Sequence, residues 1–229
     1  LSSFSGHFGT FGLIGLPEAA VNLIGDPQIW QSSRVMDAVQ IMRKMVAFVR
    51  KYSEECEEID GFLYNVEEVP GESAAYRLAM ADFVRFKNKI DRGEVFIPIL
   101  DGEPMYSNSI IPYYASIPLY RRVELEGIVQ QEFTGGVMAH LFFGEAMDPK
   151  ALKELIYRFA RNTKIVYFSI TPAISTCTSC NWKGIGVYWK CPKCGSQTEV
   201  WSRIVGYYRP VQTWHHGRKA EFKSRIHYK

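Results

Sequence analysis

Cys177-Thr-Ser-Cys180 and Cys191-Pro-Lys-Cys194 stand ten residues apart in the last quarter of this 229-residue chain. Each pair presents two thiols about one metal-ligand spacing apart, and four thiolates complete the tetrahedral shell of Zn²⁺. We therefore predict a zinc ribbon over residues 171–199. A closed four-cysteine site leaves no open coordination position, so the predicted Zn²⁺ is structural. An iron–sulfur cluster and two metal-free redox pairs are the alternatives.

The 170 residues before the ribbon carry the pattern of an α/β protein. Asp26-Pro27 predicts the start of a long helix. One face of this helix is predicted to be buried, because apolar residues recur at helical spacing. These residues are Val35, Val39, Met42, Val46 and Val49. Asp148-Pro149 predicts the start of another helix. The apolar run 164–170 is typical of a strand buried on both faces of a parallel sheet. Strands that alternate with helices indicate an α/β layer or barrel over residues 1–170.

Composition and charge narrow the class of protein. Hydrophobic residues make up 47% of the chain and charged residues 22%, as in globular proteins. No apolar run is long enough to span a bilayer and no secretory leader is recognised, so we expect a cytoplasmic protein and no membrane partner. Cys56, the remaining cysteine, lies among glutamates that disfavour a reactive thiolate.

The C-terminal segment is basic, with seven Lys and Arg and one acidic residue, Glu221, over 203–229. Such a tail can be a nucleic-acid arm, a clamp for an anionic ligand or a solvated end. Interspersed aromatic residues indicate that much of it packs, and these are Tyr207, Tyr208, Trp214, Phe222 and Tyr228.

Gly206 follows the ribbon in the stretch Ser202-Arg-Ile-Val-Gly206-Tyr-Tyr-Arg-Pro. A turn is the ordinary role for such a glycine. A stable backbone radical is the other, because a Cα without a side chain can flatten and spread an unpaired electron over the neighbouring amides. That radical needs shielding, which we expect from the flanking residues Ile204, Val205, Tyr207 and Tyr208.

The Gly206 stretch resembles the glycyl radical signature of anaerobic (class III) ribonucleotide reductases, an arginine and two variable residues before Gly-Tyr. Segments in the family's order run through the whole chain: Phe11-Gly-Leu-Ile-Gly-Leu-Pro-Glu-Ala, Asn65-Val-Glu-Glu-Val-Pro-Gly-Glu-Ser-Ala, Tyr106-Ser-Asn-Ser, Phe133-Thr-Gly-Gly-Val-Met and Tyr167-Phe-Ser-Ile-Thr-Pro. One departure is His215-His216, where the family's tail has asparagine after tryptophan.

The resemblance implies that residues 1–170 are the C-terminal half of a ten-stranded α/β barrel and that residues 200–229 hold the radical loop and basic tail. It further implies a catalytic glycyl radical at Gly206, generated by an activase that uses an iron–sulfur cluster and S-adenosylmethionine. The radical would oxidise a cysteine to a thiyl, which starts the reduction of ribonucleoside triphosphates. The family's Met-Gly-Cys-Arg context for that cysteine does not occur here. We therefore expect a C-terminal part that is inactive without its N-terminal partner.

Other implications of the resemblance are a homodimer, growth at low oxygen, and formate or a redoxin as reductant. The turn at Gly71, Glu72 and Ser73 precedes a predicted helix, whose free N–H groups suit the phosphates of the substrate. A plain helix cap is the alternative there. Two rival functions are a nucleic-acid-binding zinc-ribbon module without catalysis, and a glycyl radical enzyme for acyl or diol substrates. The family reading leads us to expect no nucleic-acid partner.

Overall fold

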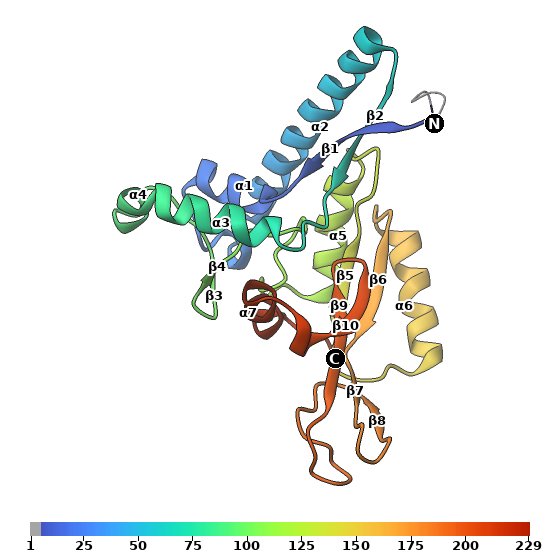
Figure 1. The fold of residues 1–229 in the computed structure, drawn as a ribbon. Helices are drawn as coiled ribbons and strands as arrows, with labels where there is room; N and C mark the ends of the chain where they lie inside the picture. The colour runs from blue at the N-terminus through green and yellow to red at the C-terminus, as the bar shows by residue number, and fades with distance from the viewer. Residues whose placement is uncertain (1–5) are drawn as a thin grey trace.

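The computed structural model describes residues 6–229. Its N-terminal part is a strand, two helices and a second strand that returns to lie beside the first (Figure 1). Strand β1 (Phe8–Leu13) pairs in parallel with β2 (Leu63–Glu68). Helices α1 (Leu16–Ile24) and α2 (Val35–Asp60) make the crossover that a parallel pair requires. This is the α/β arrangement that the sequence predicts.

A second parallel pair repeats the arrangement nearer the C-terminus. Strand β5 (Ala139–Phe143) pairs with β6 (Phe168–Pro172), and α6 (Pro149–Asn162) is the crossover, lying beside β6 in Figure 1. The predicted helix start at Asp148 is confirmed. Its carboxylate Oδ1 accepts the amide protons of Lys150 and Ala151, both at 3.0 Å, which is the N-cap interaction.

The two parallel pairs are linked but do not close into a barrel. Gly135 N donates to Val66 O and Glu68 N donates to Gly136 O, both at 2.9 Å, so β2 borders the segment that leads into β5. Helix α5 (Leu119–Gln130) packs on α2 behind these strands. Within residues 6–229 the strands form separate sheets of two and four strands and no closed barrel, so the expectation of half a ten-stranded barrel over residues 1–170 is not confirmed.

The principal core lies between the first parallel pair and helices α1, α2 and α5. Val35, Val39, Met42 and Val46 are buried there, which confirms the predicted stripe. The predicted helix start at Asp26 is wrong, because α2 begins at Val35. Asp26 Oδ1 instead accepts the amide proton of Gln28 (3.0 Å), and a single 3₁₀ turn, Ile29–Gln31, follows and buries Trp30 in the core.

The predicted strand over 164–170 is wrong in its start and its burial. Strand β6 begins at Phe168, and Val166 and Tyr167 are about half exposed or more, at 62% and 49%. Gln130 Oε1 accepts the amide protons of both residues, at 2.8 and 3.1 Å. A side chain of α5 therefore takes the hydrogen bonds that a neighbouring strand would need.

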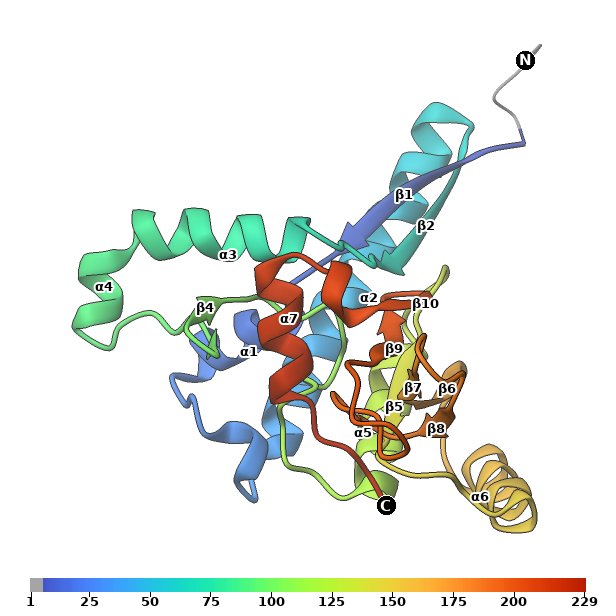
Figure 2. The same ribbon diagram turned by 60° about the horizontal axis from the view of Figure 1, so that its bottom comes forward.

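Helix α3 (Ala74–Arg85) and the short α4 (Lys87–Asp91) extend to one side of the molecule, as Figure 2 shows. The two-residue strands β3 (Ile99–Leu100) and β4 (Glu103–Pro104) pair beneath them. The first residues of α3 follow directly on the 71–73 turn.

The C-terminal quarter is one antiparallel sheet with the strand order β10-β9-β7-β8. Its strands are β7 (Ile174–Thr176), β8 (Lys183–Ile185), β9 (Glu199–Ile204) and β10 (Tyr207–Pro210). A 3₁₀ turn (Val211–Thr213) and helix α7 (His216–Ser224) follow, and in both views α7 lies between α3 and β9 (Figures 1 and 2). Trp214 and Phe222 are buried, so the prediction that the basic tail packs is confirmed.

No helix within residues 6–229 has the combined length and apolar character needed to cross a membrane.

Candidate functional site

The four cysteines of the two pairs converge at one end of the C-terminal sheet. Their Sγ atoms all lie within 4.8 Å of one another, and Cys177–Cys194 and Cys180–Cys191 are each 3.6 Å apart. Four sulfurs at the Zn–S distance of about 2.3 Å form a tetrahedron with edges of about 3.8 Å. The spacing therefore fits one Zn²⁺ with all four ligands from the protein.

The backbone around the cysteines is that of two tight turns. Cys177 N donates to Trp182 O and Cys191 N donates to Ser196 O, both at 2.8 Å, which closes one turn around each pair. Lys193 N points at Cys191 Sγ from 3.4 Å, so an amide hydrogen faces the sulfur that would carry negative charge. These turns prepare the thiolates before any metal binds, which fits a structural site.

Gly206 lies in the two-residue turn between β9 and β10, where Ile204 pairs with Tyr207. The positive φ of this turn is at Val205, at 51°, and not at Gly206. A Cβ added to Gly206 would meet no atom within 4 Å. Neither backbone conformation nor lack of space therefore requires glycine at position 206, while a β-branched residue occupies the position where glycine is expected.

The prediction that flanking residues shield Gly206 from solvent is largely wrong for this chain by itself. Gly206 is exposed and Tyr207 is 55% exposed. Ile204 is buried, but it packs against Val200 and Trp214 on the other side of the hairpin. One contact does fix the turn: Arg203 Nη1 donates to Gly206 O at 2.6 Å.

The four-cysteine cluster and Gly206 lie at opposite ends of β9. Thr176, next to Cys177, pairs with Glu199 at the start of this strand, and Gly206 follows its last residue, Ile204. A six-residue strand at about 3.3 Å per residue separates them by nearly 20 Å. The cluster thus anchors the base of the hairpin whose tip carries Gly206.

A cleft of about 190 Å³ opens beside the hairpin tip. Residues from five separate segments line it, among them Glu68, Asn108, His140, Tyr167 and Gly206. Since these segments lie far apart in the sequence, the fold itself assembles the cleft.

Two titratable side chains in the cleft have strongly perturbed protonation. Burial raises the pKa of the Glu68 carboxyl well above its ordinary value, and the charge of Glu126 adds to this effect. Burial also lowers the pKa of His140 to about 4, helped by the charges of Arg225 and Arg203, so this imidazole is neutral near pH 7. His140 Nδ1 is 2.8 Å from Ser169 Oγ, and Glu68 Oε1 has no hydrogen-bond partner within residues 6–229.

From the sequence, neither Glu68 nor His140 is predicted to have a functional role. One feature of the sequence could have indicated a role for Glu68. It is the last residue of a strand, just before the Pro70-Gly71 turn, and binding sites often form at the carboxyl ends of parallel strands. Nothing in the sequence around His140 distinguishes it from a core histidine.

The 71–73 turn precedes α3 as predicted and contacts the C-terminal segment. Ser73 is the N-cap residue of α3 but makes no side-chain cap hydrogen bond, so the alternative of a plain side-chain cap has no support here. Tyr207 Oη, next to Gly206, donates to Glu72 Oε1 at 3.1 Å. The structure therefore brings together the turn and the Gly206 hairpin, two of the three predicted sites, and keeps the cysteine cluster apart.

Comparison with known proteins gives a consistent family and fold. A family model described as "Anaerobic ribonucleoside-triphosphate reductase" matches residues 2–228. A solved structure named "Anaerobic ribonucleotide reductase" is similar over 100% of this chain and 35% of its own, with 23% identity and a TM-score of 0.71. The anaerobic ribonucleotide reductase from Thermotoga maritima in complex with dATP and CTP is similar over 95% of this chain and 33% of its own, with 22% identity and a TM-score of 0.65.

These structural likenesses establish the fold, and the chain spans about a third of the length of the solved structures it matches. A search of curated protein sequences found no match.

Proposed function

The chain belongs to the anaerobic ribonucleoside-triphosphate reductase family, and from that premise we propose that it is the C-terminal part of an enzyme that converts ribonucleoside triphosphates to deoxyribonucleotides by radical chemistry. Gly206 is the residue proposed to carry the radical. The catalytic body would be completed by an N-terminal part that supplies the other barrel strands and the thiyl cysteine.

The observation that carries this proposal is the geometry at Gly206. The turn needs glycine at position 205 more than at 206, and a methyl group at 206 would touch nothing. A chemical demand for a Cα that bears two hydrogens explains a glycine that the backbone does not require. The cleft beside Gly206 supplies the space in which a radical reaction can occur.

The exposure of Gly206 in this chain assigns a second task to the proposed N-terminal part. A glycyl radical that reached solvent would be open to oxygen, so the upstream barrel strands would cover the hairpin tip. Activation would require a separate S-adenosylmethionine and iron–sulfur enzyme that removes one hydrogen atom from the Gly206 Cα. Formate or a redoxin as reductant, a homodimer and a cytoplasmic location remain parts of the proposal.

Cys177, Cys180, Cys191 and Cys194 would hold Zn²⁺, which supplies no chemistry to the substrate and stabilises the fold when bound. The ligand turns lie at the base of β9, so the ion would fix the strand that presents Gly206.

The substrate would lie in the cleft with its phosphates toward the 71–73 turn. Backbone amides at the start of α3 suit phosphate oxygens, and the N-terminal end of the helix dipole favours negative charge. Glu72 would contribute its backbone, since its carboxylate repels phosphate and is already engaged by Tyr207. Glu68 Oε1, buried without a partner, is the group proposed to exchange a proton with the bound nucleotide.

The experiment is anaerobic electron paramagnetic resonance on the chain reconstituted with its N-terminal part and an activase. Wild type should give a doublet that collapses when glycine is deuterated at Cα. Gly206→Ala should give no signal, and its stability should change by only about 0.5 kcal/mol because the new methyl group has open space.

Gly144→Ala is the matched control, since Gly144 also lacks a positive φ and a Cβ there meets its first atom at 3.6 Å. This variant should keep the doublet. If wild type gives no signal with an activase that is competent on another reductase, the radical proposal fails and the nucleic-acid-binding module becomes the better reading.

A further inference from the structure

Helix α7 and the residue that follows it carry three buried charged side chains, Arg218, Glu221 and Arg225, which we call the α7 triad. Glu221 bridges the two guanidinium groups: its Oε2 accepts from Arg218 Nη1 at 2.7 Å and its Oε1 accepts from Arg225 Nε at 2.5 Å. All three residues are at most 6% exposed. Burial by itself would raise the pKa of Glu221, but the charges of Arg225 and Arg218 outweigh it and hold the pKa below its ordinary value.

Arg218 contacts the turn proposed to bind phosphate. Its Nε donates to Glu72 O at 3.0 Å, and its Nη2 lies 3.3 Å from both Pro70 O and Gly71 O. One guanidinium group thus holds three consecutive carbonyls. His215 Nε2 adds a second donor to Glu72 O at 2.9 Å.

The consequence for the turn follows from peptide geometry. In a planar trans peptide the N–H points opposite to the C=O of the same unit, and no cis bond occurs within residues 6–229. Because the carbonyls of residues 70–72 point at Arg218, the amides of Gly71, Glu72 and Ser73 point away from it. Gly71, with φ of 50°, supplies the left-handed residue found in anion-binding backbone nests.

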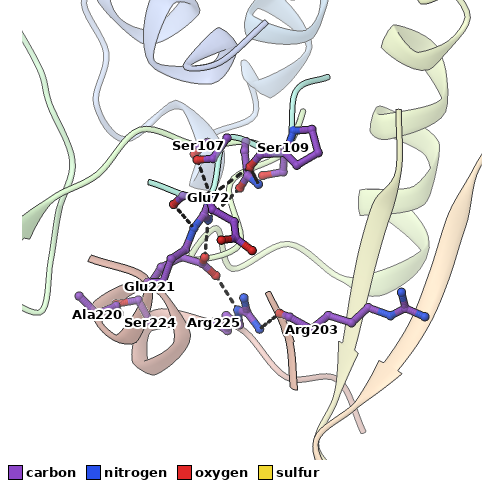
Figure 3. A network of polar contacts seen from close by, with 12 residues as sticks. Glu72, Ser107, Ser109, Arg203, Ala220, Glu221, Ser224 and Arg225 are labelled. Carbon is purple, nitrogen blue, oxygen red and sulfur yellow. Dashed lines mark hydrogen bonds and ion pairs between the residues drawn. The ribbon is translucent and has the colours of Figure 1, made fainter. Parts of the chain in front are cut away.

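Arg225 contacts the other proposed site, the Gly206 hairpin. Its Nη1 donates to Arg203 O at 3.1 Å and to Ser202 Oγ at 3.2 Å. Figure 3 shows Arg225 between the Glu221 carboxylate and the Arg203 backbone. Arg203 is in turn the residue whose guanidinium holds Gly206 O.

Aromatic rings fix the position of the Arg225 guanidinium. Its central carbon lies 4.0 Å from the ring centre of Phe142, and three further rings lie within 5.7 Å, those of Trp214, Phe222 and Tyr113. The group has little freedom to move, so Arg225 is a rigid support for the hairpin.

Stability alone is a weak reason for such a cluster. Removing charges from water costs free energy, and an apolar replacement of similar volume is often as stable as a buried ion network. A buried network with directional bonds does, however, fix the geometry of its partners. Beyond its own members, the α7 triad bonds to the 70–72 carbonyls, to Asn108 Oδ1 in the cleft (3.0 Å), and to Ser202 and Arg203 of β9.

We propose that the α7 triad is a positioning device that orients the 71–73 amides toward the substrate triphosphate through Arg218 and holds the Gly206 hairpin in register with them through Arg225. Arg218 and Arg225 are positioning residues, since neither contacts the reacting atoms. This inference rests on the proposed function and adds to it the residues that join its two halves.

The test uses the chain reconstituted with its N-terminal part and activase, and compares Arg218→Lys with Arg225→Lys. Lysine keeps the charge but lacks the planar fork that serves several acceptors at once. Radical yield by electron paramagnetic resonance reports on the hairpin, and KM for a ribonucleoside triphosphate reports on the turn. Arg158→Lys, on the exposed face of α6 with a single partner at Glu154, is the matched control.

Arg218→Lys should raise KM about tenfold or more at unchanged radical yield, because several carbonyls lose a charged donor. Arg225→Lys should lower radical yield severalfold in protein whose KM is unchanged. Glu221→Gln should show both effects and Arg158→Lys neither. The inference would be overturned if Arg218→Lys and Arg225→Lys changed KM and radical yield to the same extent, or if neither variant changed either quantity.

Two milder variants decide the matter if the lysine variants do not fold. His215→Ala removes one donor to Glu72 O and should affect KM alone, and Ser202→Ala removes one acceptor of Arg225 and should affect radical yield alone. Absence of radical and of reduction in wild type would instead refute the proposed function. If wild type is active but the variants do not separate an effect on KM from an effect on radical yield, only the positioning role is refuted.

Discussion

Glu18 is a buried carboxyl in the principal core, and its replacement by glutamine should change how the stability of the protein depends on pH. Glu18 is 2% exposed at the start of α1. Its carboxyl accepts from Ser107 Oγ at 2.8 Å and from Ser107 N at 3.1 Å. Burial raises its pKa from 4.5 to about 7, and the hydrogen bonds from Ser107 offset only part of that rise.

The sign of the effect follows from the raised pKa. The folded protein binds this proton more tightly than the unfolded chain, so stability is fully present below pH 4.5 and is lost as pH rises through about 7. Each pKa unit between the two states is worth about 1.36 kcal/mol, which gives a total loss of about 3 kcal/mol. About 2 kcal/mol of this loss falls between pH 5.5 and 7.

The assay is urea unfolding of the zinc-loaded chain between pH 5.5 and 8.5, for wild type and Glu18→Gln. The glutamine does not ionise, so the difference in unfolding free energy between the two proteins should shift by about 2 kcal/mol in favour of the variant across this range. Glu126, whose pKa burial also raises to about 7, is present in both proteins and cancels from the difference. Glu145→Gln, on the surface, should give no shift. A constant difference between wild type and Glu18→Gln would refute the reasoning.

Three further substitutions test the proposed zinc site, the core and the cap of α6. Cys191→Ser should abolish stoichiometric zinc binding and melt the C-terminal sheet, seen as loss of bound metal by atomic absorption and of amide protection over β7 to β9; retention of both would refute the shared site. Leu125→Ala, at a fully buried position of α5, should lower the unfolding free energy by about 2–5 kcal/mol in urea melts, and a loss below 1 kcal/mol would contradict the assigned core. Asp148→Ala should cost about 1 kcal/mol through loss of the α6 cap, whereas Asp148→Asn should cost little, and equal losses would argue against the cap.

The predictions that succeeded depend on interactions between near neighbours in the sequence. The stripe of α2 repeats every three or four residues, and Asp148 bonds to amides only two and three positions away. The cysteine pairs are similar, because each tight turn fixes two ligands locally and only one long-range contact is then needed.

Most of the predictions that failed depended on contacts between distant residues, although the failed helix start at Asp26 goes with a local hydrogen bond from Gln28 N. Gln130 accepts hydrogen bonds from the amides of Val166 and Tyr167, which lie 36 and 37 residues away in the sequence. No pattern within residues 164–170 predicts these contacts. The exposure of Gly206 is of the same kind, since its flanking residues are apolar but the hairpin turns Ile204 toward Trp214. Glu68 and His140 likewise stand out only once the fold brings five segments together at one cleft.

The basic tail shows how a distant contact changes the meaning of a composition. As a sequence, residues 203–229 suit a nucleic-acid arm, because seven positive charges stand against one negative. In the structure Arg218 and Arg225 are buried against Glu221, and Lys223 pairs with Asp101. Charges that are buried or paired release few counterions from a phosphate backbone, so they add little to nucleic-acid affinity. Two of the seven positive charges of the tail therefore act inside the protein and a third is paired at the surface, which weakens the case for a nucleic-acid-binding arm.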